Sequence, residues 1–130
     1  MKLLEGVTVV DFTHAYSGPF CTMQLADFGA TVIKIEKPGE GDQSREWLLL
    51  RNGHSGYYAA INRGKKSLAL DISVPEGAEI AKNLIAKADI VVENFRPGTM
   101  KKFGLDYEAV SKENPKLVYA SISGFGQNAP

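Results

Sequence analysis

Short apolar runs rich in β-branched residues alternate along this chain with segments of helical periodicity, and this alternation is typical of βαβ units around a parallel sheet. We predict helices at about residues 18–28 and 73–88, a short basic helical turn around residues 100–102, and a last helix from about residue 106 to residue 114. Five runs are predicted as strands, at residues 7–11, 31–35, 67–71, 90–92 and 117–122. The sequence therefore predicts an α/β fold, doubly wound and Rossmann-like, with a mainly parallel sheet of about five strands and helices on both faces.

Capping residues set the expected starts of the helices. Ser17 is predicted to cap the first helix. Ser73, with Glu76 in the capping-box position, is predicted to start the second long helix. Asp106 is predicted to cap the last one.

Residues 38–66 interrupt the alternation, because glycines and the aromatic residues Trp47, Tyr57 and Tyr58 occur there with weak periodicity. We predict a long excursion with one short helix. Residues 123–130 form a glycine-rich loop of the kind that normally leads into another helix. We therefore expect residues 1–130 to be the N-terminal part of a larger domain that continues beyond this sequence.

In a doubly wound sheet with the strand order third, second, first, fourth, fifth, the ligand crevice opens between the first and fourth strands. The loops at residues 12–18 and 94–98 would line it, so His14 is expected near Asn94 and Phe95. Free N–H groups at the start of the first helix would favour an anionic group or a developing oxyanion there. On residue type alone, His14 could equally bond a strand end, and Phe95 could pack in the core or stack on a flat ring.

Composition excludes several classes of partner. Fifteen basic residues balance fifteen acidic ones, so charge gives no reason to expect nucleic acid or an anionic membrane as the main partner. The single Cys21 excludes an internal disulfide, and with two histidines it makes a poor metal set. No signal peptide is recognised, and no apolar run approaches the roughly 20 residues of a membrane span. We expect a metal-free protein of the cytoplasm or an organellar matrix.

A nicotinamide or flavin dinucleotide is the first cofactor to consider for such a sheet, but the required glycine spacing is missing. The loop after the first strand offers only Gly18 followed by Pro19, so the backbone cannot approach a pyrophosphate closely. Glu36, where a ribose-binding carboxylate would stand, is weak support by itself. We therefore expect no NAD.

Ten sequence blocks share their order and spacing with one known family. Among them are Asp11-Phe12-Thr13-His14 and Glu93-Asn94-Phe95-Arg96-Pro97-Gly98. All ten lie at residues 4–7, 11–14, 18–20, 25–30, 32–38, 41–42, 63–67, 70–71, 93–98 and 123–127. Together they resemble the N-terminal part of the class III coenzyme A transferases, also called CaiB/BaiF, a family that includes formyl-CoA:oxalate and carnitine CoA-transferases and α-methylacyl-CoA racemase.

The resemblance implies that the crevice binds coenzyme A or acyl-CoA as a substrate. The residues that match CoA-binding positions are His14, Ala15, Lys37, Leu70, Asn94, Phe95, Arg96 and Lys102. His14 and Ala15 match positions near the pantetheine thiol. Lys37 and Leu70 match part of the adenosine site. Asn94 and Phe95 match the contact to the pantetheine arm, and Lys102 resembles a basic position near the phosphates.

In such enzymes an aspartate attacks the acyl thioester, and an aspartyl-CoA thioester forms by way of a mixed anhydride before the acceptor acid takes CoA. That aspartate follows the glycine-rich loop, beyond Pro130, and no aspartate of this chain matches it. The resemblance thus implies no catalytic residue in this chain, only His14 and Tyr16 as active-site lining, and no activity of the chain alone. It also implies an interlocked homodimer for the full-length protein, acting on an acyl-CoA and a carboxylic acid.

Two departures from the formyl-CoA enzyme leave the reaction open. Tyr16 stands where that enzyme has a glutamine, which argues against formyl or oxalate as the acyl pair, and Arg96 replaces a glycine. A transferase for a larger carboxylic acid and a racemase of the α-methylacyl-CoA type are both alternatives. A stand-alone CoA-binding or nucleotide-binding module without chemistry is a third, and a dinucleotide oxidoreductase is the least favoured.

Overall fold

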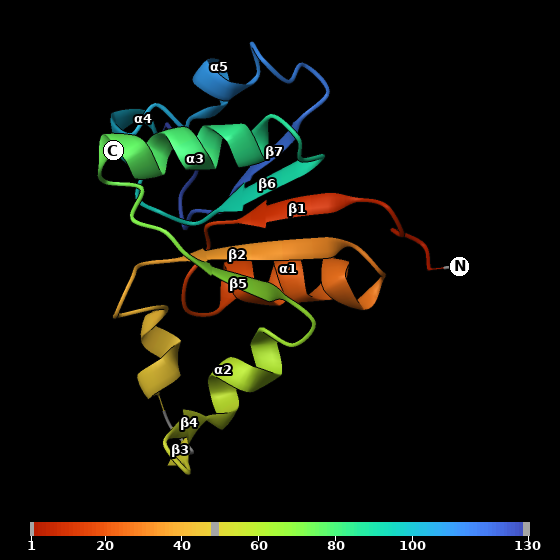
Figure 1. Cartoon of the computed structure of the whole chain (residues 1–130), viewed down its shortest axis with the longest axis vertical. Coiled ribbons are helices and arrows are strands. Elements are labelled where there is room, and N and C mark those ends of the chain that lie inside the picture. Colours follow the sequence, from red (N-terminus) through yellow and green to blue (C-terminus); the bar gives the residue numbers. More distant parts are fainter. Residues whose placement is uncertain (1, 48–49, 129–130) are drawn as a thin grey trace.

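The computed structural model describes residues 2–47 and 50–128, which form a five-stranded sheet with helices on both sides and a smaller two-stranded sheet (Figure 1). In chain order the elements are β1 (Thr8–Asp11), α1 (Ser17–Asp27), β2 (Thr31–Glu36), a 3-10 helix η1 (Gln43–Glu46), β3 (Leu50–Arg51), β4 (His54–Ser55), α2 (Gly56–Ile61), β5 (Lys66–Ala69), α3 (Pro75–Ile85), β6 (Ile90–Glu93), α4 (Thr99–Lys102), α5 (Tyr107–Val110) and β7 (Val118–Ser121).

The large sheet has the order β5-β2-β1-β6-β7, and its paired strands are parallel. This is the predicted order, with β1 at the centre. Val9 of β1 lies beside Val32 of β2 on one side and Ile90 of β6 on the other. The strand order therefore reverses between β1 and β6, where the sequence predicted the crevice.

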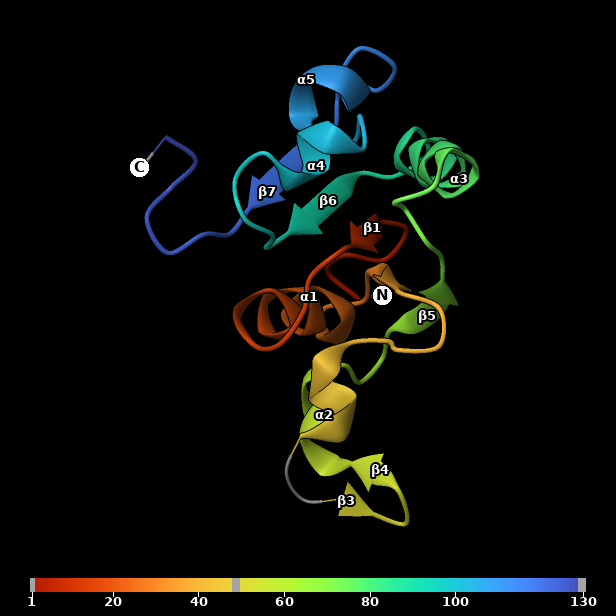
Figure 2. The ribbon, with the colours of Figure 1, turned by 90° about the vertical axis from the view of Figure 1, so that its left-hand side faces the viewer.

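Successive residues of a strand point to opposite faces, and in the central strands β1 and β6 both faces are buried. Val10 and Val91 belong to the larger core, which includes Ile85 of α3. Their neighbours Val9 and Val92 belong to the core on the α1 side. Figure 2 shows α1 and α3 on opposite sides of the sheet, as a doubly wound fold requires.

The starts of the helices differ from the capping pattern. Ser17 is the first residue of α1 rather than its cap, and the cap position is held by Tyr16, without a side-chain hydrogen bond. Ser73 does not cap α3 either. Its hydroxyl donates to Asp71 Oδ1, and Val74 holds the cap position before Pro75, the first residue of the helix.

The last helix begins after Asp106, as predicted, but the Asp106 side chain makes no capping hydrogen bond and the helix is short. Even α1 and α3 have only 11 residues each. Among the described residues, no helix combines the length and apolarity that crossing a membrane requires.

The excursion between β2 and β5 contains more structure than predicted. It holds η1, the β3–β4 hairpin and α2, and it extends away from the helices α3, α4 and α5 (Figure 1). Asn52 and Gly53 have φ angles of 52° and 78° between the two short strands, which suits the tight turn of a hairpin. This Asn-Gly pair was the signal that could have predicted the hairpin.

Replacing Gly77 by alanine tests how closely α3 approaches the segment after β5. A Cβ at Gly77 would overlap the backbone carbonyl oxygen of Asp71. Alanine favours a helix over glycine by about 1 kcal/mol, but overpacking costs typically about 1–3 kcal/mol. We expect Gly77→Ala to lower the free energy of unfolding, measured in urea. The exposed Glu79→Ala on the same helix should change it by less than about 0.5 kcal/mol, and a stabilising Gly77→Ala would contradict the close approach.

Candidate functional site

A crevice of about 590 Å³ opens at the carboxyl ends of β1, β2 and β5. Four predicted ligand contacts, His14, Lys37, Leu70 and Phe95, line it together. The rest of its wall is formed by Phe12, Ile35, Glu36, Glu40, Gly41, Gln43, Asp71, Ile72, Ser73, Thr99 and Phe103. Residues from four separate segments of the sequence thus meet at one edge of the sheet.

Asn94 clamps the loop after β1 to the loop after β6. The backbone N–H of His14 donates to Asn94 Oδ1 over 2.8 Å, and Asn94 Nδ2 donates to the His14 carbonyl oxygen over 2.9 Å. The rings of His14 and Phe95 lie 5.4 Å apart between centroids. The predicted proximity of these three residues is confirmed, and the reason is a two-way amide contact that no sequence pattern specifies.

The next two residues of the loop leave the crevice wall. Ala15 has a left-handed backbone, with φ of 68°, and its N–H donates to Asp42 Oδ1 over 3.2 Å. The Tyr16 side chain is exposed, and its ring stacks 5.8 Å from that of Phe20. Tyr16 is not part of the lining of the 590 Å³ crevice, and its role stays a prediction.

The turn after β6 separates the crevice from a second hollow of about 480 Å³. Asn94, Phe95 and Arg96 line this hollow together with Ser17 and residues 122–124. Arg96 also borders a third hollow, of about 400 Å³, with Lys101. Lys102 lies on α4, exposed and outside the lining of the 590 Å³ crevice. The roles of Arg96 and Lys102 therefore stay predictions.

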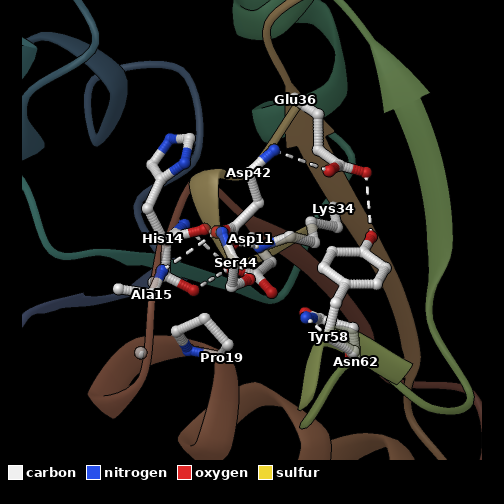
Figure 3. A network of polar contacts seen from close by, with 12 residues as sticks. Asp11, His14, Ala15, Pro19, Lys34, Glu36, Asp42, Ser44, Tyr58 and Asn62 are labelled. Atoms are coloured by element: carbon white, nitrogen blue, oxygen red, sulfur yellow. Dashed lines mark hydrogen bonds and ion pairs between the residues drawn. The ribbon is translucent and has the colours of Figure 1, made fainter. Parts of the chain in front are cut away.

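Charged side chains form a buried network at the carboxyl ends of β1 and β2 (Figure 3). Asp11 is fully buried, and its carboxylate accepts hydrogen bonds from Thr13, Thr22 and Lys65. Lys34 is also fully buried, in the middle of the apolar strand β2. This network was not predicted from the sequence, although a lysine inside the run Val-Ile-Lys-Ile was a signal that its charge needs an internal partner.

Glu36 joins the excursion to the sheet. Burial would raise the pKa of this carboxyl group, but hydrogen bonds from Arg45, Ser67 and the Asp42 N–H outweigh burial and hold the pKa at about 2. Arg45 donates through Nε and Nη2, each over 2.8 Å, and Tyr58 donates over 3.1 Å. Glu36 is thus a structural anion rather than a candidate base.

The groups around the crevice suit binding better than chemistry. Burial lowers the pKa of His14 below its usual 6.5, so its imidazole is neutral at neutral pH. The Asp11 and Glu36 carboxylates are occupied by the donors described above, and Lys37 pairs with Glu40 over 2.6 Å. Among residues 2–47 and 50–128, no cluster of three or more histidine, cysteine or acidic side chains is arranged to hold a metal ion.

Comparison with known proteins gives one consistent result. Residues 4–130 match the family "CoA-transferase family III". The chain is 47% identical over 131 residues to succinyl-CoA:glutarate CoA-transferase of Mus musculus, covering 100% of this chain and 30% of that protein. It is 48% identical over 126 residues to formyl-CoA:oxalate CoA-transferase of Afipia carboxidovorans, covering 96% of this chain and 30% of that protein.

A solved structure agrees with these relatives. The crystal structure of a CAIB/BAIF family protein from Brucella suis superposes with a TM-score of 0.92 and 42% identity, covering 99% of this chain and 35% of that one. The chain therefore spans about 30% of the length of the curated relatives described above.

Titration of His14 tests its burial against Phe95. Because burial lowers its pKa, the NMR titration midpoint of the His14 ring should fall below 6.5. Phe95→Ala uncovers the ring and should move the midpoint upward. A wild-type midpoint at or above 6.5 would contradict the buried placement.

The pH dependence of stability tests Glu36. Its pKa falls from 4.5 to about 2 on folding, so its contribution is complete above pH 4.5 and is lost as the pH falls toward 2. We expect Glu36→Gln to lower the free energy of unfolding by about 2–3 kcal/mol at pH 7 and by much less near pH 2. Glu40→Gln is the control, because Glu40 is exposed and its ion pair should contribute less than about 1 kcal/mol. A pH-independent difference for Glu36→Gln would show that shape, not charge, is responsible.

Proposed function

Because the chain belongs to CoA-transferase family III, we propose that it forms the coenzyme A-binding N-terminal part of an acyl-CoA:carboxylate CoA-transferase. The observation that carries this proposal is the crevice at the carboxyl edge of the sheet. Lys37 and Leu70 follow β2 and β5, and His14 and Phe95 follow β1 and β6. Their convergence supports one long ligand, with its adenosine near the first pair and its pantetheine arm near the second.

The wall of the crevice supports an uncharged part of the ligand better than its phosphates. Ile35, Leu70, Ile72, Phe95 and Phe103 supply apolar surface for adenine and the pantetheine chain. The lining also carries three acidic residues, Glu36, Glu40 and Asp71, so its negative charges outnumber the positive charge of Lys37. The phosphates would therefore lie toward the rim, and Lys102 on α4 is proposed to contact them.

The chemistry would use an aspartate from outside this chain. Its carboxylate oxygen bonds to the acyl carbon and the CoA thiolate leaves, giving an aspartyl anhydride. The thiolate then attacks the aspartyl carbonyl and releases the donor acid, and the acceptor acid takes CoA by the reverse steps. The amino end of α1, whose cap position makes no side-chain hydrogen bond, follows the His14 loop and would favour the negative charge of the thiolate.

We propose a substrate larger than formate or oxalate. The mouse relative carries succinyl and glutarate in its name, and the Afipia relative carries formyl and oxalate. Tyr16 replaces the glutamine that the resemblance assigns to the formyl-CoA enzyme, and its exposed ring lies next to the rings of Phe20 and Tyr57. The full-length protein is proposed to be an interlocked homodimer.

The alternatives differ in what they need besides acyl-CoA. A transferase moves CoA only when an acceptor carboxylate is present, whereas a racemase inverts the α-carbon of an acyl-CoA without an acceptor. A binding module does neither, and a dinucleotide enzyme would be protected against heat by NAD better than by CoA. Assaying the complete gene product with a panel of acyl-CoAs and carboxylic acids separates these cases.

Calorimetry with CoA tests the binding proposal directly. In the complete gene product, Lys37→Ala should weaken CoA binding about fivefold to tenfold, because the adenosine end loses the contact of a lining side chain. Lys87→Ala is the matched control, since Lys87 is an exposed lysine just after α3 and outside the crevice lining. It should leave the dissociation constant unchanged. Absence of CoA binding by the wild-type protein, or equal losses in both variants, would contradict the proposed site.

A further inference from the structure

A buried ion pair between Lys34 and Asp42 contacts the His14 loop and takes no part in the proposed transfer of CoA. Lys34 Nζ is 2.9 Å from Asp42 Oδ2, and both side chains are fully shielded from solvent. Burying two charges costs several kcal/mol, and their mutual attraction offsets only part of this cost. Such a pair is therefore weak evidence for a contribution to stability. Its contacts point to another use.

Each member of the pair holds one side of the loop. Lys34 Nζ donates to the Thr13 carbonyl oxygen over 2.6 Å, and Asp42 Oδ1 accepts from the Ala15 N–H over 3.2 Å. Ser44 fixes that carboxylate oxygen, donating through its N–H over 2.9 Å and its hydroxyl over 2.8 Å. Figure 3 shows these side chains converging on the loop.

The loop needs such a support because its backbone is strained. A residue other than glycine in the left-handed region costs about 1–2 kcal/mol, and Ala15 lies there with φ of 68°. Asn94 already fixes His14 from the β6 side. The pair therefore grips the residues before and after His14, from the β2 side.

We infer that Lys34 and Asp42 are positioning residues that fix the His14 loop for the pantetheine arm of CoA, and that they do not serve the adenosine end. This inference rests on the proposed function. The loop contacts of the pair go to Thr13 and Ala15, whereas the adenosine end is assigned to Lys37 and Leu70.

A CoA fragment without the arm separates the two ends. In the complete gene product, calorimetry would compare CoA with 3′-phospho-ADP, which lacks pantetheine. Asp42→Asn places an amide beside the buried Lys34 ammonium and should release the loop. We expect the dissociation constant of CoA to rise about tenfold and that of the fragment to change less than about twofold.

A second variant and a control keep the result interpretable. The double variant Lys34→Met with Asp42→Leu removes both charges at similar volume, which is often tolerated, and should show the same selective loss. Asp89→Asn is the matched control, because Asp89 Oδ2 accepts from the Thr8 N–H at the opposite end of β1. It should change neither dissociation constant.

Three results would overturn the inference. They are equal losses for CoA and the fragment, no loss for either, and failure of both Asp42 variants to fold, which would make the pair a requirement of the fold itself. If the wild-type protein bound neither ligand, the proposed function would fail as well. Selective loss in either folded variant, with Asp89→Asn unchanged, supports the positioning role.

Discussion

The need to pair buried charges at the carboxyl ends of β1 and β2 governs the local structure. Asp11, Lys34 and Glu36 stand in or at the end of apolar strands and are almost completely buried. An unpaired charge in such a place costs several kcal/mol, so partners must come from the segments that follow these strands. The loop after β1 and both ends of the excursion supply them, with Asp42 and Arg45 near its start and Lys65 at its end. The same pairing that satisfies the charges also fixes the walls of the crevice.

The two halves of the sheet meet at this edge through side chains rather than through the strands alone. Asn94 joins the β6 side to His14, and Asp42 joins the β2 side to Ala15. The loop between them is therefore held from both neighbours of β1, while the charged residues beneath it are engaged with one another. This arrangement suits a surface that binds a ligand rather than one that carries out chemistry.

The sequence predicted the sheet well because its information is local. Each strand is an apolar run with its own turn signals, and the known rules of parallel sheets then give the order and bring His14 to Asn94 and Phe95. The charge network was not predictable in the same way. Asp11 and Lys65 are 54 residues apart, and their contact depends on the path of the whole excursion. The weak periodicity of residues 38–66 says nothing about that path.

The lack of a side chain at Gly77 determines the position of part of the candidate binding surface. Because this residue has no Cβ, α3 can lie directly against the carbonyl group of Asp71. Leu70, Asp71 and Ile72 form one wall of the crevice. The helix and that wall are consequently in van der Waals contact through the backbone, with no flexible side chain between them to absorb a shift. A ligand that displaced residues 70–72 would have to move α3 with them. The packing of α3 therefore sets the width of the crevice at these residues.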